Sequence, residues 1–170
     1  MIAVDICNTL ADVNSVIVEH FKPISEQYPL PIPDGFWKTK EGIKIFKNAL
    51  PLKNAAEVIS GVSNLLGGVI YVTSRPAEVE FITYQWLKKH GFPKGRVIFC
   101  DRKEKLSVYS ALQPCIIAED DPEVINELQK LDVSPILVYQ WPYNRHLRGN
   151  NIIPIEQWDT SQERGVLSWR

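Results

Sequence analysis

The chain opens with an apolar run that ends in an acidic residue. Residues 1–4 are apolar, Asp5 follows them, and the stretch from there to Asp12 mixes polar and apolar positions. This pattern predicts a short buried strand with Asp5 at its carboxyl end. In an open parallel sheet, ligands bind beyond the carboxyl ends of the strands, so a carboxylate placed there is available for chemistry. The same stretch is also compatible with Asp5 as the start of a loop or the cap of a turn.

From Asn54 onwards, stretches with the pattern of helices and of strands alternate along the chain. Helices are predicted over residues 54–66, 77–90, 103–112 and 122–131. Strands are predicted over residues 69–72, 96–100, 115–118 and 136–139. Strands that alternate with helices of this length predict a three-layer, Rossmann-like α/β domain with a mainly parallel sheet.

The region between the first strand and this regular part, residues 12–52, is a candidate insertion. Asp12 or Asn14 can cap a helix, which Pro23 is expected to kink or divide. Three prolines and a glycine within residues 28–35 indicate an extended connector, and an aromatic helical piece follows it. No strand is evident in the insertion, from residue 11 to about residue 51. We therefore expect a small helical cap rather than an independent domain.

Length, composition and charge limit the classes of function. The chain has 170 residues, 45% of them hydrophobic, which predicts one domain over residues 1–170 with a packed core. A formal net charge of -1 offers no basic surface for nucleic acid. The sequence contains no apolar run long enough to span a membrane, and no basic segment comes before the first predicted strand. We therefore expect no membrane span and no signal peptide. The expected location is cytoplasmic.

The three cysteines do not indicate a disulfide framework or a zinc site. They are Cys7, Cys100 and Cys115, an odd number without CxxC spacing. Cys100 and Cys115 lie in apolar runs, so we expect them to be small buried hydrophobic residues.

Chemically active side chains follow several of the predicted strands. They are Asp5, then Thr73 and Ser74, then Lys103 and Lys105 at a helix start, and then Glu119 and Asp120. Mg²⁺ is usually held by one or two carboxylates together with phosphate and water, which Asp5 and Asp120 can provide. An aspartate can also attack phosphorus as a nucleophile, while hydroxyl and ammonium groups stabilise the transferring oxygens. This set predicts a magnesium-assisted phosphoryl-transfer site.

Taken singly, each of these side chains also has a structural explanation. A Thr-Ser pair after a strand is commonly a turn, and a lysine at a helix start is commonly a solvated side chain. One residue of the acidic run, Asp121, is expected to cap the helix that begins at Pro122. Their occurrence together and in this order favours the site.

In this order the chain resembles the haloacid dehalogenase (HAD) superfamily of phosphohydrolases. The motifs that carry the resemblance are Asp5-x-Cys7-x-Thr9, Val72-Thr73-Ser74-Arg75, a lysine at Lys105 with Lys103 as the alternative, and Ala118-Glu119-Asp120-Asp121. Within the superfamily, Leu10-Ala11-Asp12 and Trp141-Pro-Tyr-Asn-Arg145 are similar to the 5'(3')-deoxyribonucleotidase group. Enzymes of that group carry a small helical cap, as expected here.

The resemblance implies roles for the motif residues. Asp5 would be the nucleophile, and Mg²⁺ would be held by Asp5, Asp120 and the backbone carbonyl of Cys7. The expected substrate-binding residues are Thr73 and Ser74 with the lysine at the phosphate, together with Arg75 and Thr9. The implied substrate is a small phosphate ester, a nucleotide first of all, and neither nucleic acid nor a membrane is an expected partner.

Cys7 departs from the superfamily pattern, because its phosphatases normally have a second aspartate there as general acid and base. One alternative is therefore a phosphate- or nucleotide-binding protein with weak or lost turnover, and Glu119 is the nearest candidate for a substitute acid. A signalling receiver domain fits poorly, since it needs its acidic cluster early and its hydroxyl later. A P-loop enzyme is disfavoured, because no Gly-x-x-x-x-Gly-Lys-Ser/Thr string occurs.

Aromatic residues of the insertion suggest a binding surface for a base. The candidates are Phe21, Phe36, Trp37 and Phe46. Aromatic side chains stack on bases with little discrimination. The alternative for each of them is a place in the small core of the cap itself.

Overall fold

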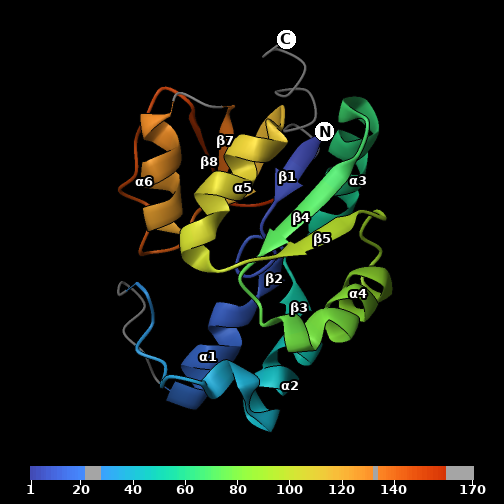
Figure 1. Cartoon of the computed structure of the whole chain (residues 1–170), viewed down its shortest axis with the longest axis vertical. Helices are drawn as coiled ribbons and strands as arrows, with labels where there is room; N and C mark the ends of the chain where they lie inside the picture. Colours follow the sequence, from blue (N-terminus) through green and yellow to red (C-terminus); the bar gives the residue numbers. More distant parts are fainter. Residues whose placement is uncertain (22–27, 132–133, 160–170) are drawn as a thin grey trace.

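The computed structural model describes residues 1–21, 28–131 and 134–159. One sheet is built from strands β1 (Ile2–Val4), β4 (Val69–Thr73), β5 (Arg96–Phe99), β6 (Ile116–Glu119), β7 (Ile136–Tyr139) and β8 (Ile152–Ile155). The order across this 6-stranded sheet is β5-β4-β1-β6-β7-β8, and every neighbouring pair is parallel. The predicted α/β fold with a parallel sheet is confirmed (Figure 1).

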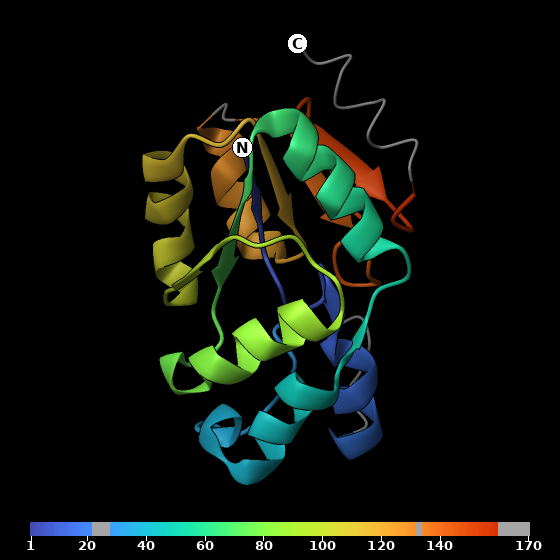
Figure 2. The same ribbon diagram turned by 90° about the vertical axis from the view of Figure 1, so that its right-hand side faces the viewer.

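Helices cover both faces of the sheet. They are α3 (Ala55–Leu66), α5 (Lys105–Leu112) and α6 (Pro122–Lys130), whereas α4 (Glu80–Lys89) lies beside α2 (Lys40–Asn48). Figures 1 and 2 show α5 and α6 on one face and α3 on the other. Short 3-10 helices, Ala77–Val79 and Arg102–Glu104, lead into α4 and α5, so the helices predicted from residues 77 and 103 begin with a tighter turn.

Two apolar clusters, one on each face, hold these layers together. On β1, Ile2 and Val4 belong to the cluster under α3, whereas Ala3 belongs to the cluster under α5 and α6. Strands that are buried on both faces need apolar residues at consecutive positions, which explains the continuous apolar runs in the sequence. Each fully buried Val, Leu or Ile side chain stabilises the fold by about 1.5–3 kcal/mol.

The segment predicted to form the cap, residues 12–52, is mainly helical in its described part. It contains α1 (Val13–Phe21), a 3-10 helix (Phe36–Lys38) and α2 (Lys40–Asn48). Asp12 caps α1, because its carboxylate accepts a hydrogen bond of 2.9 Å from the backbone N–H of Ser15. Pro23 lies outside the described residues.

The expectation that the insertion contains no strand is wrong. The strands β2 (Ala11–Asp12) and β3 (Leu50–Pro51) pair antiparallel where the chain leaves the main domain and returns to it (Figure 1). Two residues are too few to show an alternating pattern, so this pairing depends on the closeness of the two ends of the insertion. Helix α4 supports the cap from the other side, since it packs against α2 and the indole N–H of Trp86 donates to the carbonyl of Ala49 at 2.8 Å.

Two further expectations need correction. Strand β8 was not predicted, because Pro154 lies inside it; a proline is tolerated here since β8 is an edge strand. Cys115 is exposed and Cys100 is only half-buried, although both were expected to be buried. Cys115 precedes β6 at the amino edge of the sheet, where its sulfur lies 3.5 Å from the amino group of Met1.

None of the helices in the described part of the chain has the length and the apolar composition needed to span a membrane.

Candidate active site

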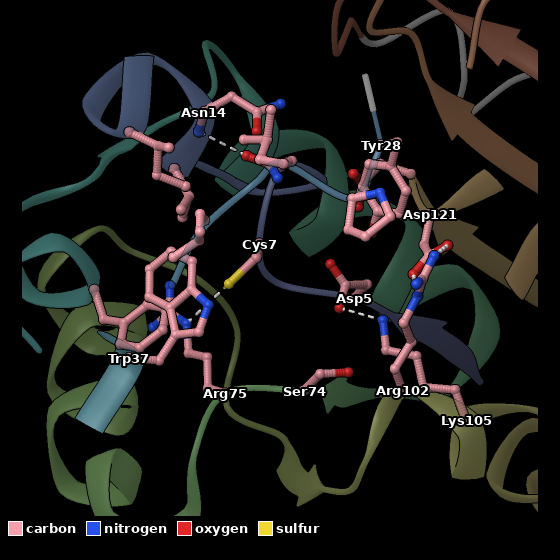
Figure 3. Close-up of a pocket in the computed structure, with 18 of the residues that line it drawn as sticks. Asp5, Cys7, Asn14, Tyr28, Trp37, Ser74, Arg75, Arg102, Lys105 and Asp121 are labelled. Atoms are coloured by element: carbon pink, nitrogen blue, oxygen red, sulfur yellow. Dashed lines mark hydrogen bonds and ion pairs between the residues drawn. The ribbon is translucent and has the colours of Figure 1, made fainter. Parts of the chain in front are cut away.

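A pocket of about 410 Å³ lies between the carboxyl ends of the strands and the cap (Figure 3). Seven of the predicted site residues line it, namely Asp5, Cys7, Ser74, Arg75, Lys105, Glu119 and Asp120. They come from the end of β6 and from the segments that follow β1, β4, β5 and β6, so the parallel sheet brings together residues that are far apart in the chain. Thr9 and Thr73 are fully buried and are not among the residues that line the pocket.

Lys105 and Asp5 form a buried ion pair at the floor of the pocket. The Nζ of Lys105 lies 2.6 Å from Oδ1 of Asp5, and each residue is 3% exposed. Lys105 is the first residue of α5, and the turn before it is closed by a hydrogen bond from the backbone N–H of Asp101 to the carboxylate of Glu104. Of the two lysines considered from the sequence, Lys103 is exposed and Lys105 lines the pocket.

Glu119 holds the same lysine from the other side. Its carboxylate accepts hydrogen bonds from Lys105 Nζ at 2.9 and 3.2 Å and from the hydroxyl of Tyr109 at 2.9 Å. The backbone N–H groups of Asp120 and Asp121 each donate to it at 3.2 Å. Burial raises the pKa of Glu119 to about 7, although Lys105 opposes this shift. These contacts favour Glu119 as the anchor of Lys105 rather than as a substitute acid.

Asp120 is held by hydroxyl groups from two distant segments. Thr9 donates to Oδ1 at 3.1 Å, and the hydroxyl of Tyr143 donates to Oδ2. The side-chain amide of Asn144 donates to the backbone carbonyl of Asp120 at 2.8 Å. Burial, followed by the negative charges of Asp5 and Glu119, raises the pKa of Asp120 well above its ordinary value.

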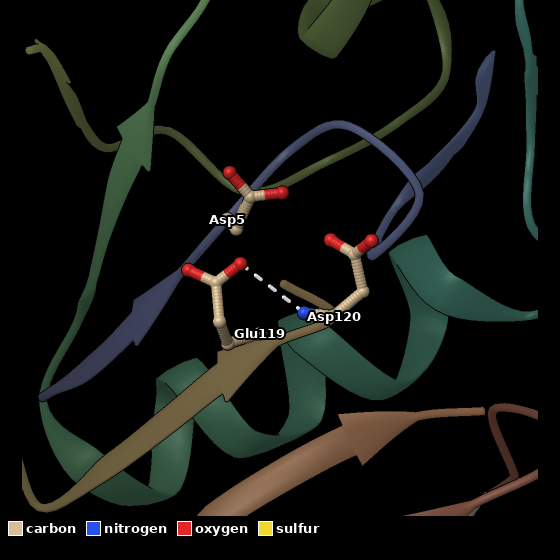
Figure 4. A group of neighbouring side chains, drawn as sticks. All are labelled: Asp5, Glu119 and Asp120. Carbon is tan, nitrogen blue, oxygen red and sulfur yellow. Dashed lines mark hydrogen bonds between the residues drawn. The ribbon is translucent and has the colours of Figure 1, made fainter. Parts of the chain in front are cut away.

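Asp5, Glu119 and Asp120 form a cluster that suits a metal ion (Figure 4). One carboxylate oxygen from each lies within 4.8 Å of the others. Burial also raises the pKa of Asp5, again against the effect of Lys105. Three buried carboxylates with one lysine carry an excess of negative charge, which a divalent cation would offset. Because the hydrogen bonds of Glu119 point to the lysine and to the backbone, Asp5 and Asp120 are the residues that fit Mg²⁺ best.

The motif after β4, Val72-Thr73-Ser74-Arg75, contributes one exposed hydroxyl and one buried cation. Ser74 is exposed and lines the pocket, whereas the hydroxyl of Thr73 accepts a hydrogen bond of 3.3 Å from the backbone N–H of Arg75. The Nε of Arg75 donates to the sulfur of Cys7 at 3.3 Å. Burial raises the pKa of the Cys7 thiol, although the guanidinium opposes this, so the thiol is protonated at neutral pH.

Two tryptophans fix the loop that follows Asp5. The indole N–H of Trp141 donates to the carbonyl of Asn8 at 2.7 Å, and that of Trp158 donates to the carbonyl of Thr9 at 2.9 Å. Asn8 has a φ of 60°, a left-handed conformation that asparagine tolerates better than most residues. The residues after β7 therefore support the motif Asp5-x-Cys7-x-Thr9.

The four cap aromatics form one continuous series of ring contacts. Trp37 and Phe46 stack on each other with ring centroids 4.9 Å apart, and both line the pocket. Phe36 meets Trp37 edge to face at 5.4 Å and Phe21 edge to face at 4.8 Å, and neither Phe21 nor Phe36 is among the lining residues. Tyr28, which was not considered from the sequence, also lines the pocket.

Tyr28 and Asn14 are site residues that the sequence analysis missed as such. Tyr28 packs on Tyr143 with ring centroids 4.7 Å apart, and the guanidinium of Arg102 lies 4.9 Å from its ring centre. Asn14 was considered only as a helix cap, yet its side-chain amide donates to the hydroxyl of Tyr143 at 3.2 Å. The only local signal for Tyr28 was an aromatic residue at the start of a proline-rich connector.

Two solved structures share this fold, a haloacid dehalogenase-like family hydrolase from Xanthomonas campestris and a HAD-superfamily hydrolase from Ehrlichia chaffeensis. Their TM-scores are 0.56 and 0.55, each is 10% identical to this chain, and the alignments cover 99% of this chain and 94% and 96% of theirs. The protein therefore has the fold of the HAD-superfamily hydrolases.

In sequence, the chain is similar to a protein of Halalkalibacterium halodurans described as "Putative nucleotidase BH1399". The two are 23% identical over 140 residues, which are 79% of this chain and 69% of that protein. No protein-family model matches the chain.

Proposed function

We propose that this protein is a magnesium-dependent phosphatase that forms an aspartyl-phosphate on Asp5. The observation that carries the proposal is the buried contact of 2.6 Å between Lys105 and Asp5, at the floor of a pocket that Asp120 also lines. A carboxylate is a known nucleophile in phosphoryl transfer, and a lysine beside it provides positive charge for the transferring oxygens.

The reaction then takes two steps. One oxygen of Asp5 attacks phosphorus and forms a P–O bond, while the bond from phosphorus to the leaving oxygen breaks and that oxygen takes the electron pair. Water then attacks the aspartyl-phosphate, which releases inorganic phosphate and restores the carboxylate. Lys105 and Ser74 bind the non-bridging oxygens, and Asp120 together with Asp5 holds Mg²⁺. When bound, Mg²⁺ neutralises charge on the phosphoryl group and on the acidic cluster.

A nucleotide is the leading substrate within this proposal. The stacked rings of Trp37 and Phe46 line the pocket, and Tyr28 adds a third aromatic side chain to its wall. Such rings bind the face of a base. The sequence similarity to a protein described as a nucleotidase supports the same class. A cytoplasmic location belongs to the same proposal, and cell fractionation tests it.

A second candidate function is a phosphate- or nucleotide-binding protein with weak turnover. Cys7 favours it, because burial keeps the thiol protonated and a thiol is a poor substitute for a carboxylic acid in proton transfer. The binding function would use the same pocket and the same cation.

One experiment separates the two. A panel of nucleotides and sugar phosphates is incubated with the purified protein and Mg²⁺, and phosphate release and the ligand-induced shift in Tm are measured on the same sample. Release that a chelator abolishes supports the phosphatase. Shifts in Tm without release support the binding protein, and neither release nor a shift contradicts both.

A further inference from the structure

Within residues 1–21, 28–131 and 134–159, Arg75 is a buried cation without a carboxylate partner. It is 3% exposed, and its polar contacts are with neutral atoms, the sulfur of Cys7 at 3.3 Å and the hydroxyl of Thr83 at 3.4 Å. The rings of Phe46 and Trp86 flank the guanidinium, with centroids 4.9 and 5.5 Å from its central carbon. None of the ion pairs found among the described residues includes Arg75.

Arg102, on the opposite wall of the same pocket, shows the usual arrangement. Its guanidinium contacts the carboxylate of Asp121 through two nitrogens and that of Glu123 at 3.2 Å. Buried charges in proteins are normally paired in this way, because removing an ion from water without a partner is costly. Arg75 departs from this rule inside a pocket, which points to an anion supplied by a ligand.

One nitrogen of Arg75 has no hydrogen-bond partner among the described residues. This is the buried Nη2, whereas Nε and Nη1 are used by Cys7 and Thr83. The other buried side-chain atom without a partner, among the residues that the structure describes, is Oδ1 of Asn14. Both residues line the same pocket. Among the buried side-chain atoms that the structure describes, the unused hydrogen-bonding capacity is therefore one cationic donor and one acceptor.

The orientation of the Asn14 amide follows from its neighbours. The hydroxyl of Tyr143 donates its proton to Asp120, so it accepts from the Nδ2 of Asn14 at 3.2 Å. The Oδ1 of Asn14 is thereby left as an acceptor for a hydroxyl or N–H group of a ligand.

Arg75 lies on the side of the pocket away from the lysine. Figure 3 shows Lys105 beside Asp5, whereas Arg75 lies beside Cys7 and Trp37, with Ser74 between the two groups. A phosphoryl group at Asp5 would be bound by Ser74 and Lys105. The guanidinium therefore lies on the side of the pocket where the leaving part of such a substrate would be.

Cys7 keeps this guanidinium available. An aspartate at this position, as the superfamily pattern leads one to expect, would place a carboxylate next to Nε of Arg75 and neutralise its charge. The neutral thiol, 3.3 Å from Nε, does not.

We propose that Arg75 forms a second anion-binding subsite, which selects phosphate esters whose leaving part carries another negatively charged group, such as a second phosphate or a carboxylate. Asn14 accepts a hydrogen bond from a hydroxyl of the same ligand. The proposal rests on the proposed function for the reaction, but binding of the second anion does not require turnover.

The test compares ligands that differ in the second anion. One pair is a nucleoside 5'-monophosphate and the matching 3',5'-bisphosphate, and the other is ethyl phosphate and phosphoglycolate. Affinities are measured by calorimetry with Mg²⁺ at a temperature where turnover is negligible, and phosphate release is measured separately. A hydrogen bond to a charged group predicts that the second anion tightens binding about 10- to 100-fold in at least one pair.

Variants then assign the preference to Arg75. Arg75→Met should lose the preference for the second anion, whereas Arg96→Met, which removes the same charge from an exposed position on β5, should keep it. If Arg75→Met does not fold, Cys7→Asp provides the test, since the introduced carboxylate neutralises the guanidinium in place and should also reduce the preference.

The outcomes separate this subsite from the proposed function. Equal binding within both pairs overturns the subsite even if phosphate is released. A preference for the second anion that survives in Arg75→Met also overturns it. If Arg75→Met does not fold, a preference that survives in Cys7→Asp has the same meaning. A preference that depends on Arg75 supports the subsite even if no ester is hydrolysed, and it then supports the binding protein over the phosphatase. A protein that binds none of the four ligands contradicts both proposals.

Discussion

The ammonium group of Lys105 lies 2.6 Å from the carboxylate of Asp5, although 100 residues separate the two in the chain. Asp5 directly follows β1 and Lys105 begins α5, and β4 lies between β1 and β5 in the sheet. The contact therefore depends on the correct order of strands. It also fixes one carboxylate oxygen of Asp5, Oδ1, and in the proposed reaction the other oxygen attacks phosphorus.

Asp5→Asn should abolish phosphatase activity while the protein stays folded. An amide is a feeble nucleophile and a poorer magnesium ligand than a carboxylate. Phosphate release is measured for the variant and for Asp34→Asn, which makes the same change at an exposed position that lines the pocket. Tm and far-UV circular dichroism report folding. Turnover at the parent rate in a folded Asp5→Asn protein would show that the nucleophile is another group.

Tyr143→Phe should weaken Mg²⁺ binding. The hydroxyl of Tyr143 donates to Asp120 and accepts from Asn14, so its loss leaves a proposed metal ligand less well oriented. Changes to such supporting residues typically reduce metal affinity about 10- to 100-fold. Mg²⁺ titrations followed by calorimetry compare this variant with Tyr139→Phe, a change on β7 outside the pocket lining. Equal affinity in the two variants contradicts the assignment of Asp120 as a ligand.

The stabilising effect of Mg²⁺ should increase with pH. Burial raises the pKa of Glu119 to about 7 and raises those of Asp5 and Asp120, so the folded protein without metal binds more protons than the unfolded chain between their ordinary values and the raised ones. In that window these groups lower the free energy of unfolding as pH rises. Mg²⁺ binds the deprotonated carboxylates and opposes the loss.

The measurement is the difference in Tm with Mg²⁺ and with a chelator, at about pH 5 and about pH 8, which lie on either side of the raised pKa of Glu119. The difference should be larger at the higher pH. Because it compares two samples at one pH, titrating groups elsewhere largely cancel. A difference that does not change with pH, or that becomes smaller, would exclude the acidic cluster as the metal site.

Trp37→Ala should raise KM for nucleotides and leave KM for a small artificial ester unchanged. The indole lines the pocket and stacks on Phe46, so its removal takes away one face on which a base can stack. Stacking of a base on an aromatic side chain contributes about 1–3 kcal/mol. Phe21→Ala is the matched control, because Phe21 is not a lining residue and its ring contacts are with His20 and Phe36 rather than with Trp37. A rise in KM for both substrates would instead indicate damage to the cap.

The fold of the main domain was largely predictable, because short stretches of the sequence carry the patterns of its strands and helices. Alternating apolar strands and amphipathic helices fix the parallel sheet, and polar residues directly after those strands must then meet at one edge. This logic predicted that Asp5, Ser74, Lys105 and Asp120 would lie close together, and all four line one pocket.

The supporting residues were not predictable, because their roles arise only from tertiary contacts. Asn14 and Tyr143 are 129 residues apart, and no local pattern marks either as part of a site. Tyr109 is one of several apolar positions on α5 until the fold places its hydroxyl beside Glu119. The strand β8 escaped notice for another reason, since its proline contradicts the usual composition of a strand.

Cys7 governs the last prediction, because a phosphatase of this superfamily normally has an acid in its place. A positioned general acid contributes about 10²- to 10⁴-fold, so the parent protein should hydrolyse activated esters far better than nucleotides. An activated leaving group departs without a proton, which makes such an ester the internal control. Cys7→Asp should therefore raise nucleotide hydrolysis more than hydrolysis of the activated ester.

The structure limits how large this gain can be. The Nε of Arg75 lies 3.3 Å from the sulfur of Cys7, so the introduced carboxylate would lie beside a guanidinium, and an opposite charge at that distance lowers the pKa of an acid by about 1–3 units. An acid that stays ionised is a poor proton donor, so Cys7→Asp alone should fall short of the full factor.

Adding Arg75→Met to Cys7→Asp should raise nucleotide hydrolysis further, provided that the double variant folds. Cys7→Ser, which introduces no acid, should give no gain. Equal effects of Cys7→Asp on both esters, or brisk activity of the parent that Cys7→Asp diminishes, would show that the proton comes from another group or that the thiol itself takes part.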